Sequence, residues 1–258
     1  MKKRLLVVFL IFVAVVVLLL LGGTVFKLRT ADISLHSETG EEILDTSGLN
    51  ADEMMADFKG RSILFLPESQ IAANIHSKTE YSQWQVVGIE KNFPDNIRIH
   101  ITKRLQIFTL TKGGVVYALD INGYVIGVAG GADSRYIDIS RLADGINDVE
   151  IATVLTFGSA EAERDFGIIK TMTESIWQLN YDYDKIYTFL SNYQIGDDLT
   201  LFTRTGAKII VKEPDKSLSG KIINAYGVYS DDTKDMTGEN VVITVWGWGE
   251  DEYKIISG

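Results

Sequence analysis

The sequence predicts an α+β protein in which a long apolar segment precedes two folded domains. Three observations support this class. Residues 5–25 carry no charged side chain, residues 31–103 give a strand, helix, helix, strand, strand pattern, and the remainder alternates short strands with two amphipathic helices. With 258 residues, of which 46% are hydrophobic, the chain is long enough to bury the cores of two ordinary domains.

The first predicted element is a transmembrane helix over residues 5–25. These 21 uncharged residues would span about 30 Å as a helix, which is the thickness of a bilayer core. A cleaved signal peptide is the alternative, but it has a shorter apolar region and a small-residue cleavage site, for which residues 22–24 are a weak match. The basic residues at positions 2–4 predict a cytoplasmic tail, residues 1–4, with everything after about residue 28 outside.

Charge and composition exclude several classes of function. The chain has 25 basic and 35 acidic residues, and residues 1–29 hold five of the basic ones and no acidic one, so the rest carries 20 against 35, a net charge of −15. Such a field repels phosphate backbones, and we expect no nucleic-acid partner. The absence of cysteine excludes disulfides, thiol nucleophiles and zinc–thiolate sites.

The residues after the anchor predict a small sheet covered on one face by two helices. Asn50 lies three residues before Glu53, a spacing typical of a helix N-terminus, and an irregular acidic stretch at 37–48 precedes it. The expected elements are a strand at 31–36, a helix that ends at Gly60, a helix that begins at Pro67, and strands at 84–91 and 97–103 joined by a turn at 94–96.

The hairpin at the end of this domain carries a spaced set of residues: Ile89, Lys91, Pro94, Ile97, Ile99, Ile101, Lys103 and Arg104. Their spacing resembles the signature V-x-[RK]-x-x-P-x-[ST]-[LI]-x-[IV]-x-[IV]-x-E-R, which closes the POTRA domain of the FtsQ/DivIB cell-division proteins. Lys103 stands where the signature has Glu. Compared with the family, residues 37–48 look like an insertion between the first strand and the first helix.

The second half of the chain is similar to the β domain of the same family. Residues 116–125, with Asp120 and Gly123, resemble its first strand and turn, and residues 201–212 resemble its paired strands around a glycine. Lys221 falls where the family has a helix that begins near a lysine. The resemblance therefore implies a POTRA-like domain at 28–104 and a β-rich α+β domain of the FtsQ/DivIB type at 105–258.

Periodicity supports this second domain without the family. A stripe of apolar residues at helical spacing predicts one helix, and it consists of Phe166, Ile169, Met172, Ile176 and Leu179. Strands are predicted at 184–190, 199–203, 208–212 and 240–248, with a helix at 218–229.

No pattern in the sequence predicts catalysis, a cofactor or a metal. The chain has no Ser-x-x-Lys motif, and its three histidines, at 36, 76 and 100, are each more than twenty residues from the next. Carboxylate pairs at 182/184, 197/198 and 231/232 lie in turn-like stretches, where solvated loop residues are expected. We therefore predict a protein that is not an enzyme.

The C-terminal strand is the predicted partner-binding surface. A strand near the end of a chain is expected to be a sheet edge, and the segment 239–248 contains one charge and neither Lys nor Pro to protect it. Trp246 and Trp248 are two residues apart, so their side chains point to the same face of the strand. If that face is exposed, the two rings could anchor a partner; otherwise they pack on the inner face of the sheet. The expected contact residues are Val241, Ile243, Val245, Trp246 and Trp248.

The resemblance implies a function as well as a fold. Proteins of the FtsQ/DivIB family are non-enzymatic divisome scaffolds in the cell membrane at the division septum, where they link FtsL- and FtsB/DivIC-type partners to septal peptidoglycan synthesis. Two alternatives stay open at this point: a membrane-tethered cell-wall hydrolase that uses paired carboxylates, and an extracytoplasmic sensor or secretion POTRA protein.

Overall fold

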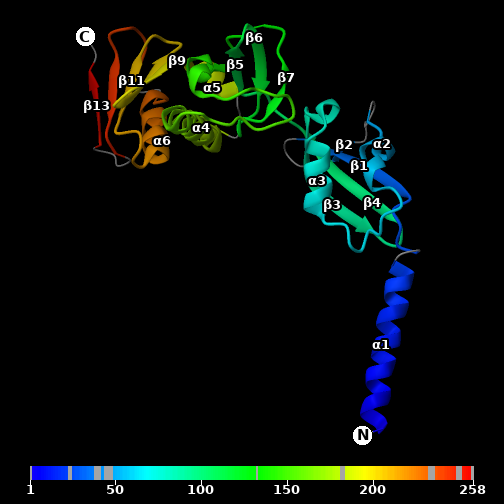
Figure 1. Cartoon of the computed structure of the whole chain (residues 1–258). Helices are drawn as coiled ribbons and strands as arrows, with labels where there is room; N and C mark the ends of the chain where they lie inside the picture. The colour runs from blue at the N-terminus through cyan, green and yellow to red at the C-terminus, as the bar shows by residue number, and fades with distance from the viewer. Residues whose placement is uncertain are drawn as a thin grey trace. The chain divides into compact units, whose positions relative to one another are not determined.

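The chain folds into two compact units, Met1–Arg104 and Leu105–Gly258 (Figure 1). The structure is a computed structural model that describes residues 2–22, 25–37, 42–43, 49–131, 133–180, 184–231, 236–247 and 252–256. Three sheets are present in these residues, and each mixes parallel with antiparallel pairing. The predicted α+β class is therefore confirmed.

The first element is the helix α1, Lys2–Gly22. Its side chains are described from residue 7 to residue 17, and all of these are exposed. In the part of the chain that the structure describes, no helix meets both the length and the hydropathy needed to cross a membrane.

The rest of the first unit is a four-stranded sheet, in the order β2-β1-β4-β3, with helices on one face (Figure 1). The strands β1 and β4 pair in parallel, and β3 and β4 form an antiparallel hairpin. The elements are β1 Thr30–His36, β2 Glu42–Ile43, α2 Ala51–Met54, the 3-10 turn η1 Ala56–Phe58, α3 Glu68–His76, η2 Thr79–Tyr81, β3 Trp84–Asn92 and β4 Asn96–Lys103. The predicted order of strand, helix, helix, strand, strand is present.

Two details of this unit differ from expectation. The first predicted helix ends early, because α2 stops at Met54 and a 3-10 turn continues towards Gly60. Its start is as predicted, since the Asn50 side chain accepts hydrogen bonds from the backbone of Asp52 and Glu53. Within the stretch 37–48, the two residues of β2 pair with the end of β1 rather than remaining irregular.

The core of the first unit lies between its helices and one face of the sheet. Ile97, Ile99 and Ile101 alternate along β4 and are fully buried, as the period of a strand requires. They pack with the buried residues Met54, Met55, Phe58, Ile71 and Ile75 from the helical side.

The second unit contains a four-stranded sheet, β7-β6-β5-β8, and a five-stranded sheet, β13-β12-β11-β10-β9. Its first half comprises β5 Phe108–Lys112, β6 Val115–Leu119, β7 Val125–Val128, β8 Ile137–Asp138, η3 Ser140–Gly145 and α4 Ala160–Asn180. Its second half comprises α5 Asp184–Phe189, β9 Leu190–Ile195, β10 Asp198–Thr203, β11 Lys208–Lys212, α6 Leu218–Tyr229, β12 Val242–Val245 and β13 Tyr253–Ile256.

One continuous core joins these two sheets, and α4 and α6 lie side by side against it (Figure 1). The predicted stripe on α4 is buried at Phe166, Ile169, Met172 and Ile176, but Leu179 is exposed, so the prediction was wrong at that last position. The helix therefore leaves the core in its final turn.

The segment predicted as a strand at 184–190 is instead the helix α5, followed by the start of β9. Ile186 and Phe189 are both buried, and their spacing of three residues suits a helix. A short run rich in aromatic and β-branched residues does not distinguish the two structures, which explains the error.

The geometry of the turn between β6 and β7 explains why Asp120 and Gly123 occupy their positions. The carboxylate of Asp120 is buried and accepts hydrogen bonds from the backbone N–H groups of Asn122 and Tyr124, at 2.8 and 2.9 Å. Gly123 has a φ of +74°, and a Cβ there would lie 2.9 Å from the Phe166 ring. Both the backbone angle and the close approach of α4 therefore favour glycine.

Candidate functional site

The predicted partner strand is not the edge of its sheet. The strand β12 pairs in parallel with β11 on one side and antiparallel with β13 on the other, with Ile243 opposite Ile255. The expectation that this strand is a sheet edge was wrong, because the four residues of β13 pair with it. The edge is therefore β13.

The five predicted contact residues are not placed alike. Val241, Ile243 and Val245 are buried in the core, so they do not form an accessible surface. Trp246 is 47% exposed, just after the end of β12, and its backbone N–H donates to the carbonyl of Glu252. Trp248 lies outside the described residues. Among the four predicted contact residues that the structure describes, Trp246 is the one that lies on the surface.

The true edge strand is short and half exposed. Tyr253 and Ile255 pack against the core of the second unit, whereas Lys254 and Ile256 alternate with them and face outward. Ile256 is 50% exposed. In the part of the chain that the structure describes, no strand pairs with the outer side of β13.

The opposite edge of the same sheet, β9, is covered by side-chain contacts. The Tyr193 hydroxyl donates to the carbonyl of Asp138 at 2.9 Å, and the Arg141 guanidinium lies 3.6 Å from the centre of the Tyr193 ring. Arg141 also donates to the Tyr193 carbonyl, which occupies a backbone acceptor of the strand. Burial raises the pKa of Tyr193 to about 12, since the phenolate would lose its hydration.

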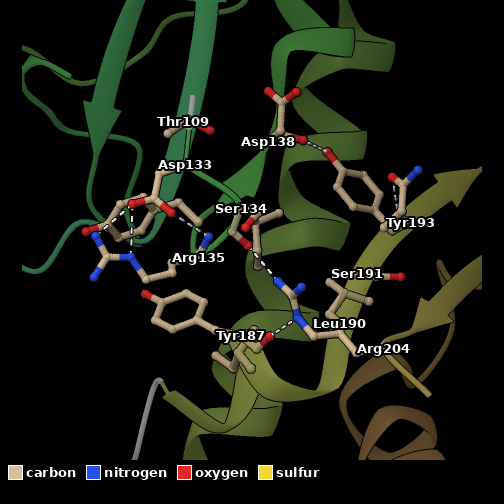
Figure 2. Close-up of a pocket in the computed structure, with 14 residues that line it drawn as sticks. Thr109, Asp133, Ser134, Arg135, Asp138, Tyr187, Leu190, Ser191, Tyr193 and Arg204 are labelled. Atoms are coloured by element: carbon tan, nitrogen blue, oxygen red, sulfur yellow. Dashed lines mark hydrogen bonds and ion pairs between the residues drawn. The ribbon is translucent and has the colours of Figure 1, made fainter. Parts of the chain in front are cut away.

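A cavity of about 380 Å³ lies where β9 faces the other sheet (Figure 2). Its lining comes from the segment 133–138, from α5 and β9, and from single residues of β5 and of the turn after β10. Tyr136 and Tyr187 meet edge to face in this region, with ring centres 5.9 Å apart. Nothing in the sequence pattern brings these segments together, so the sequence did not predict the cavity.

Charged side chains that line this cavity form hydrogen bonds with one another or with backbone carbonyl groups. Arg135 binds the Asp133 carboxylate through two guanidinium nitrogens, at 2.7 and 2.9 Å, and these hydrogen bonds hold the pKa of Asp133 below its usual value. Arg204 donates to the carbonyl of Ser134 at 2.6 Å and to that of Tyr187 (Figure 2). The Arg204–Ser134 hydrogen bond links the turn after β10, in one sheet, to the segment that precedes β8, in the other.

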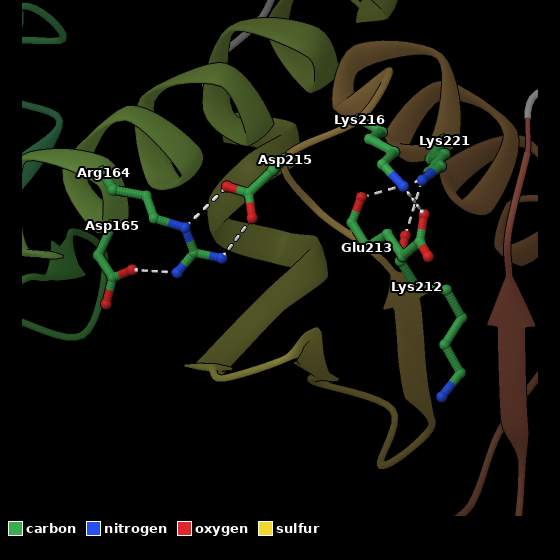
Figure 3. A network of polar contacts seen from close by, with 7 residues as sticks. All are labelled: Arg164, Asp165, Lys212, Glu213, Asp215, Lys216 and Lys221. Carbon is green, nitrogen blue, oxygen red and sulfur yellow. Dashed lines mark hydrogen bonds and ion pairs between the residues drawn. The ribbon is translucent and has the colours of Figure 1, made fainter.

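A second polar cluster fixes the loop between β11 and α6 (Figure 3). Lys221 is buried, and its ammonium donates to the carbonyls of Lys212 and Glu213, at 2.7 and 3.0 Å. Beside it, Arg164 of α4 forms two hydrogen bonds of 2.7 Å to Asp215, which lower the pKa of that carboxyl. The lysine that the family resemblance singled out thus supports a backbone turn.

Two of the three histidines meet in space although they are far apart in the sequence. The Nε2 atom of His36 and the Nδ1 atom of His100 are 2.9 Å apart on neighbouring parallel strands, and the Glu90 carboxylate is 3.8 Å from the other nitrogen of His100. His76 accepts a hydrogen bond from the backbone of Val86. Sequence separation hid the first pair, because the register of β1 and β4 decides it.

Neither the carboxylates nor the histidines form an evident metal centre. Within the described residues, no group of three or more His, Asp or Glu side chains is arranged to hold a metal ion. Of the predicted carboxylate pairs, Asp198 binds Lys212 at 2.6 Å, while Asp182 and Asp232 lie outside the described residues.

No protein-family model matches the chain, and no curated protein matches it either.

Proposed function

We propose that this chain is a non-enzymatic scaffold of the bacterial divisome, of the FtsQ/DivIB type, that links FtsL- and FtsB/DivIC-type proteins to septal peptidoglycan synthesis. The observation that carries the proposal is the topology of the first unit. A strand, two helices and a hairpin follow one another there, as the resemblance to a POTRA domain implies, and β1 pairs in parallel with β4. The spaced residues from Ile89 to Arg104 lie along that hairpin and just after it.

Residues 5–25 serve as a transmembrane anchor in this proposal. Two features of the sequence support this assignment. Residues 5–25 are long enough to cross a bilayer and carry no charged side chain, and the basic residues at 2–4 favour a cytoplasmic N-terminus. Both folded units would then lie outside the membrane, where peptidoglycan is assembled.

The partner surface is proposed to be the outer side of β13. An edge strand can accept a partner strand through backbone hydrogen bonds, while outward side chains select among partners. Lys254 and Ile256 supply such side chains on this edge, and Trp246 is exposed near the end of the strand beside it. The β9 edge is a poor alternative because Tyr193 and Arg141 already cover it.

Depletion in dividing cells tests the proposed role. We expect filaments or enlarged cells without septa, and we expect the tagged full chain to recover small single-pass division proteins from detergent extracts. Normal septation after complete removal, in a strain without a second copy, would contradict the scaffold role.

The hydrolase alternative is tested with the same purified protein. Release of soluble fragments from isolated peptidoglycan, lost on substitution of Asp197 and Asp198 together by Asn, would favour an enzyme. We expect no release, because Asp198 already binds the Lys212 ammonium.

A further inference from the structure

The chain that follows α1 enters the first unit at once. The Ile63 N–H donates to the carbonyl of Phe26 at 2.8 Å, and the Leu28 N–H donates to the carbonyl of Arg61 at 2.8 Å. On the other side, the Arg29 N–H donates to the carbonyl of Asp95 at 2.9 Å. Residues 25–29 are therefore held between the loop 59–66 and the end of the β3–β4 hairpin, residues 91–96. We call these three segments together the juxtamembrane patch.

The patch exposes large apolar side chains. Phe65 is 66% exposed and Phe93 is 56% exposed, while Val25 is 43% exposed. Phe93 contacts the ring of Phe26 edge to face, with ring centres 5.8 Å apart, and more than half of its surface is still exposed. Within the same loop, Ile63 and Leu66 are buried. Exposed aromatic side chains on a well-packed domain indicate an interaction surface.

The patch also has the opposite charge to the rest of the molecule. It holds five basic residues, Lys27, Arg29, Lys59, Arg61 and Lys91, and one acidic residue, Asp95, which gives a net charge of +4. The residues after position 29 together carry −15. The Asp95 carboxylate lies 3.7 Å from the Arg29 guanidinium, and the Lys59 ammonium lies 3.3 Å from the Asp52 carboxylate. Lys27 and Arg61 are exposed.

The reach of the backbone keeps this patch close to the end of α1. Only two residues, 23 and 24, lie between Gly22, the last residue of α1, and Val25, so the Cα atoms of Gly22 and Val25 are at most about 11 Å apart in a fully extended chain. If residues 5–25 cross a bilayer, the patch cannot move far from the headgroups. Aromatic rings with lysine and arginine are the side chains that suit this depth, because the rings bury apolar surface and the cations reach lipid phosphates.

We propose that the juxtamembrane patch lies on the lipid headgroups of the bilayer that residues 5–25 enter, with Phe65 and Phe93 in the boundary between headgroups and acyl chains. Lys27 and Arg61 bind lipid phosphates there. This contact orients the first unit on the membrane, in addition to the tether. The inference rests on the anchor assigned under the proposed function, so its test measures the anchor separately.

The test uses single-cysteine variants of the full chain, which has no native cysteine. Phe65→Cys and Phe93→Cys each carry a nitroxide label, and the protein is reconstituted into vesicles of phosphatidylethanolamine and phosphatidylglycerol. Collision with oxygen, which concentrates in the bilayer, is compared with collision with a water-soluble nickel chelate. Near-ultraviolet circular dichroism first confirms that each variant folds, as expected for substitutions at exposed positions.

Two further labels serve as controls. Val13→Cys lies in α1 and reports on the anchor. Val87→Cys is 54% exposed on β3, six residues before Phe93 and therefore roughly 20 Å from it along the strand. It matches the patch labels in exposure but not in position, which makes it the reference for a water-exposed site.

We expect a severalfold higher ratio of oxygen to nickel collisions at positions 65 and 93 than at 87, with the highest ratio at 13. We also expect that Lys27→Glu with Arg61→Glu lowers the ratio at position 93 severalfold. Equal ratios at 65, 93 and 87, with a high ratio at 13, would overturn the membrane contact and leave the anchor intact. A low ratio at 13 would overturn the anchor of the proposed function and this inference with it.

Discussion

The two edges of the five-stranded sheet differ in what covers them. At β9, Tyr193 is buried. Arg141 stacks on its ring and donates to its carbonyl, and its hydroxyl donates to the carbonyl of Asp138. At β13, Lys254 and Ile256 are exposed, and no further strand follows in the described residues. Within the described residues, the β9 edge is thus closed by the protein's own side chains, whereas the β13 edge is open because no strand pairs with its outer side. This difference is the reason why the proposed partner surface is the open edge and not the strand inside it.

The largest effect is expected from a proline inside the sheet. Ile243→Pro places a residue without an N–H group in β12, between two paired strands, at a fully buried position. We expect it to cost about 3 kcal/mol or more of the unfolding free energy, measured by denaturant unfolding of the full chain in detergent. Ile243→Val is the matched control, for which about 1 kcal/mol is expected. A proline variant as stable as wild type would mean that β12 is not an interior strand.

The closed edge is expected to weaken at high pH. Tyr193 has its pKa raised from 10.0 to about 12 by burial, so the phenol is protonated in both folded and unfolded chains below pH 10. Between pH 10 and 12 the unfolded chain ionises first, and the unfolding free energy falls by up to about 2.7 kcal/mol. Tyr193→Phe should remove this part of the pH dependence. Identical alkaline unfolding curves for the two proteins would contradict the burial of the hydroxyl.

A smaller effect is expected where the two sheets are connected. Arg204→Ala removes the hydrogen bonds to the carbonyls of Ser134 and Tyr187. Because the side chain is exposed, the expected loss is about 1 kcal/mol of the unfolding free energy. Faster backbone amide exchange at residues 133–138 would accompany it, and unchanged exchange there would show that Arg204 does not hold this segment.

The smallest effect on stability is expected at the open edge. Ile256→Asp changes a half-exposed side chain, so the unfolding free energy should move by less than about 0.5 kcal/mol. Partner recovery from cells should nevertheless fall severalfold, because a charge would face the added strand. Undiminished recovery with this variant would place the partner elsewhere.

Local patterns in the sequence predicted most of the elements. In the first unit, the period of two in residues 97–101 predicted β4 and Asn50 predicted the start of α2, because both signals depend on neighbours in the chain. The predictions failed where a short apolar run fits two structures, as at Ile186 and Phe189 of α5. They also failed at Leu179, where the helix extends past the core that it covers.

The candidate site depended on pairings that no local pattern contains. Strand β13 has only four residues, and its pairing with β12 changes Ile243 from an edge position to a central one. The contact between His36 and His100 likewise arises from the register of two strands that are far apart in sequence. Burial could be predicted from hydrophobicity, but which strand would be outermost could not.

Site-specific photo-crosslinking from Ile256 in dividing cells tests the open edge most directly. Val128, in the other sheet of the same unit, is the matched control, because it is 61% exposed and also aliphatic. If the partner strand adds to β13, position 256 should crosslink to a small membrane division protein and position 128 should not. Crosslinks of equal yield from both positions, or from neither while the full chain still recovers its partner, would contradict a partner on β13.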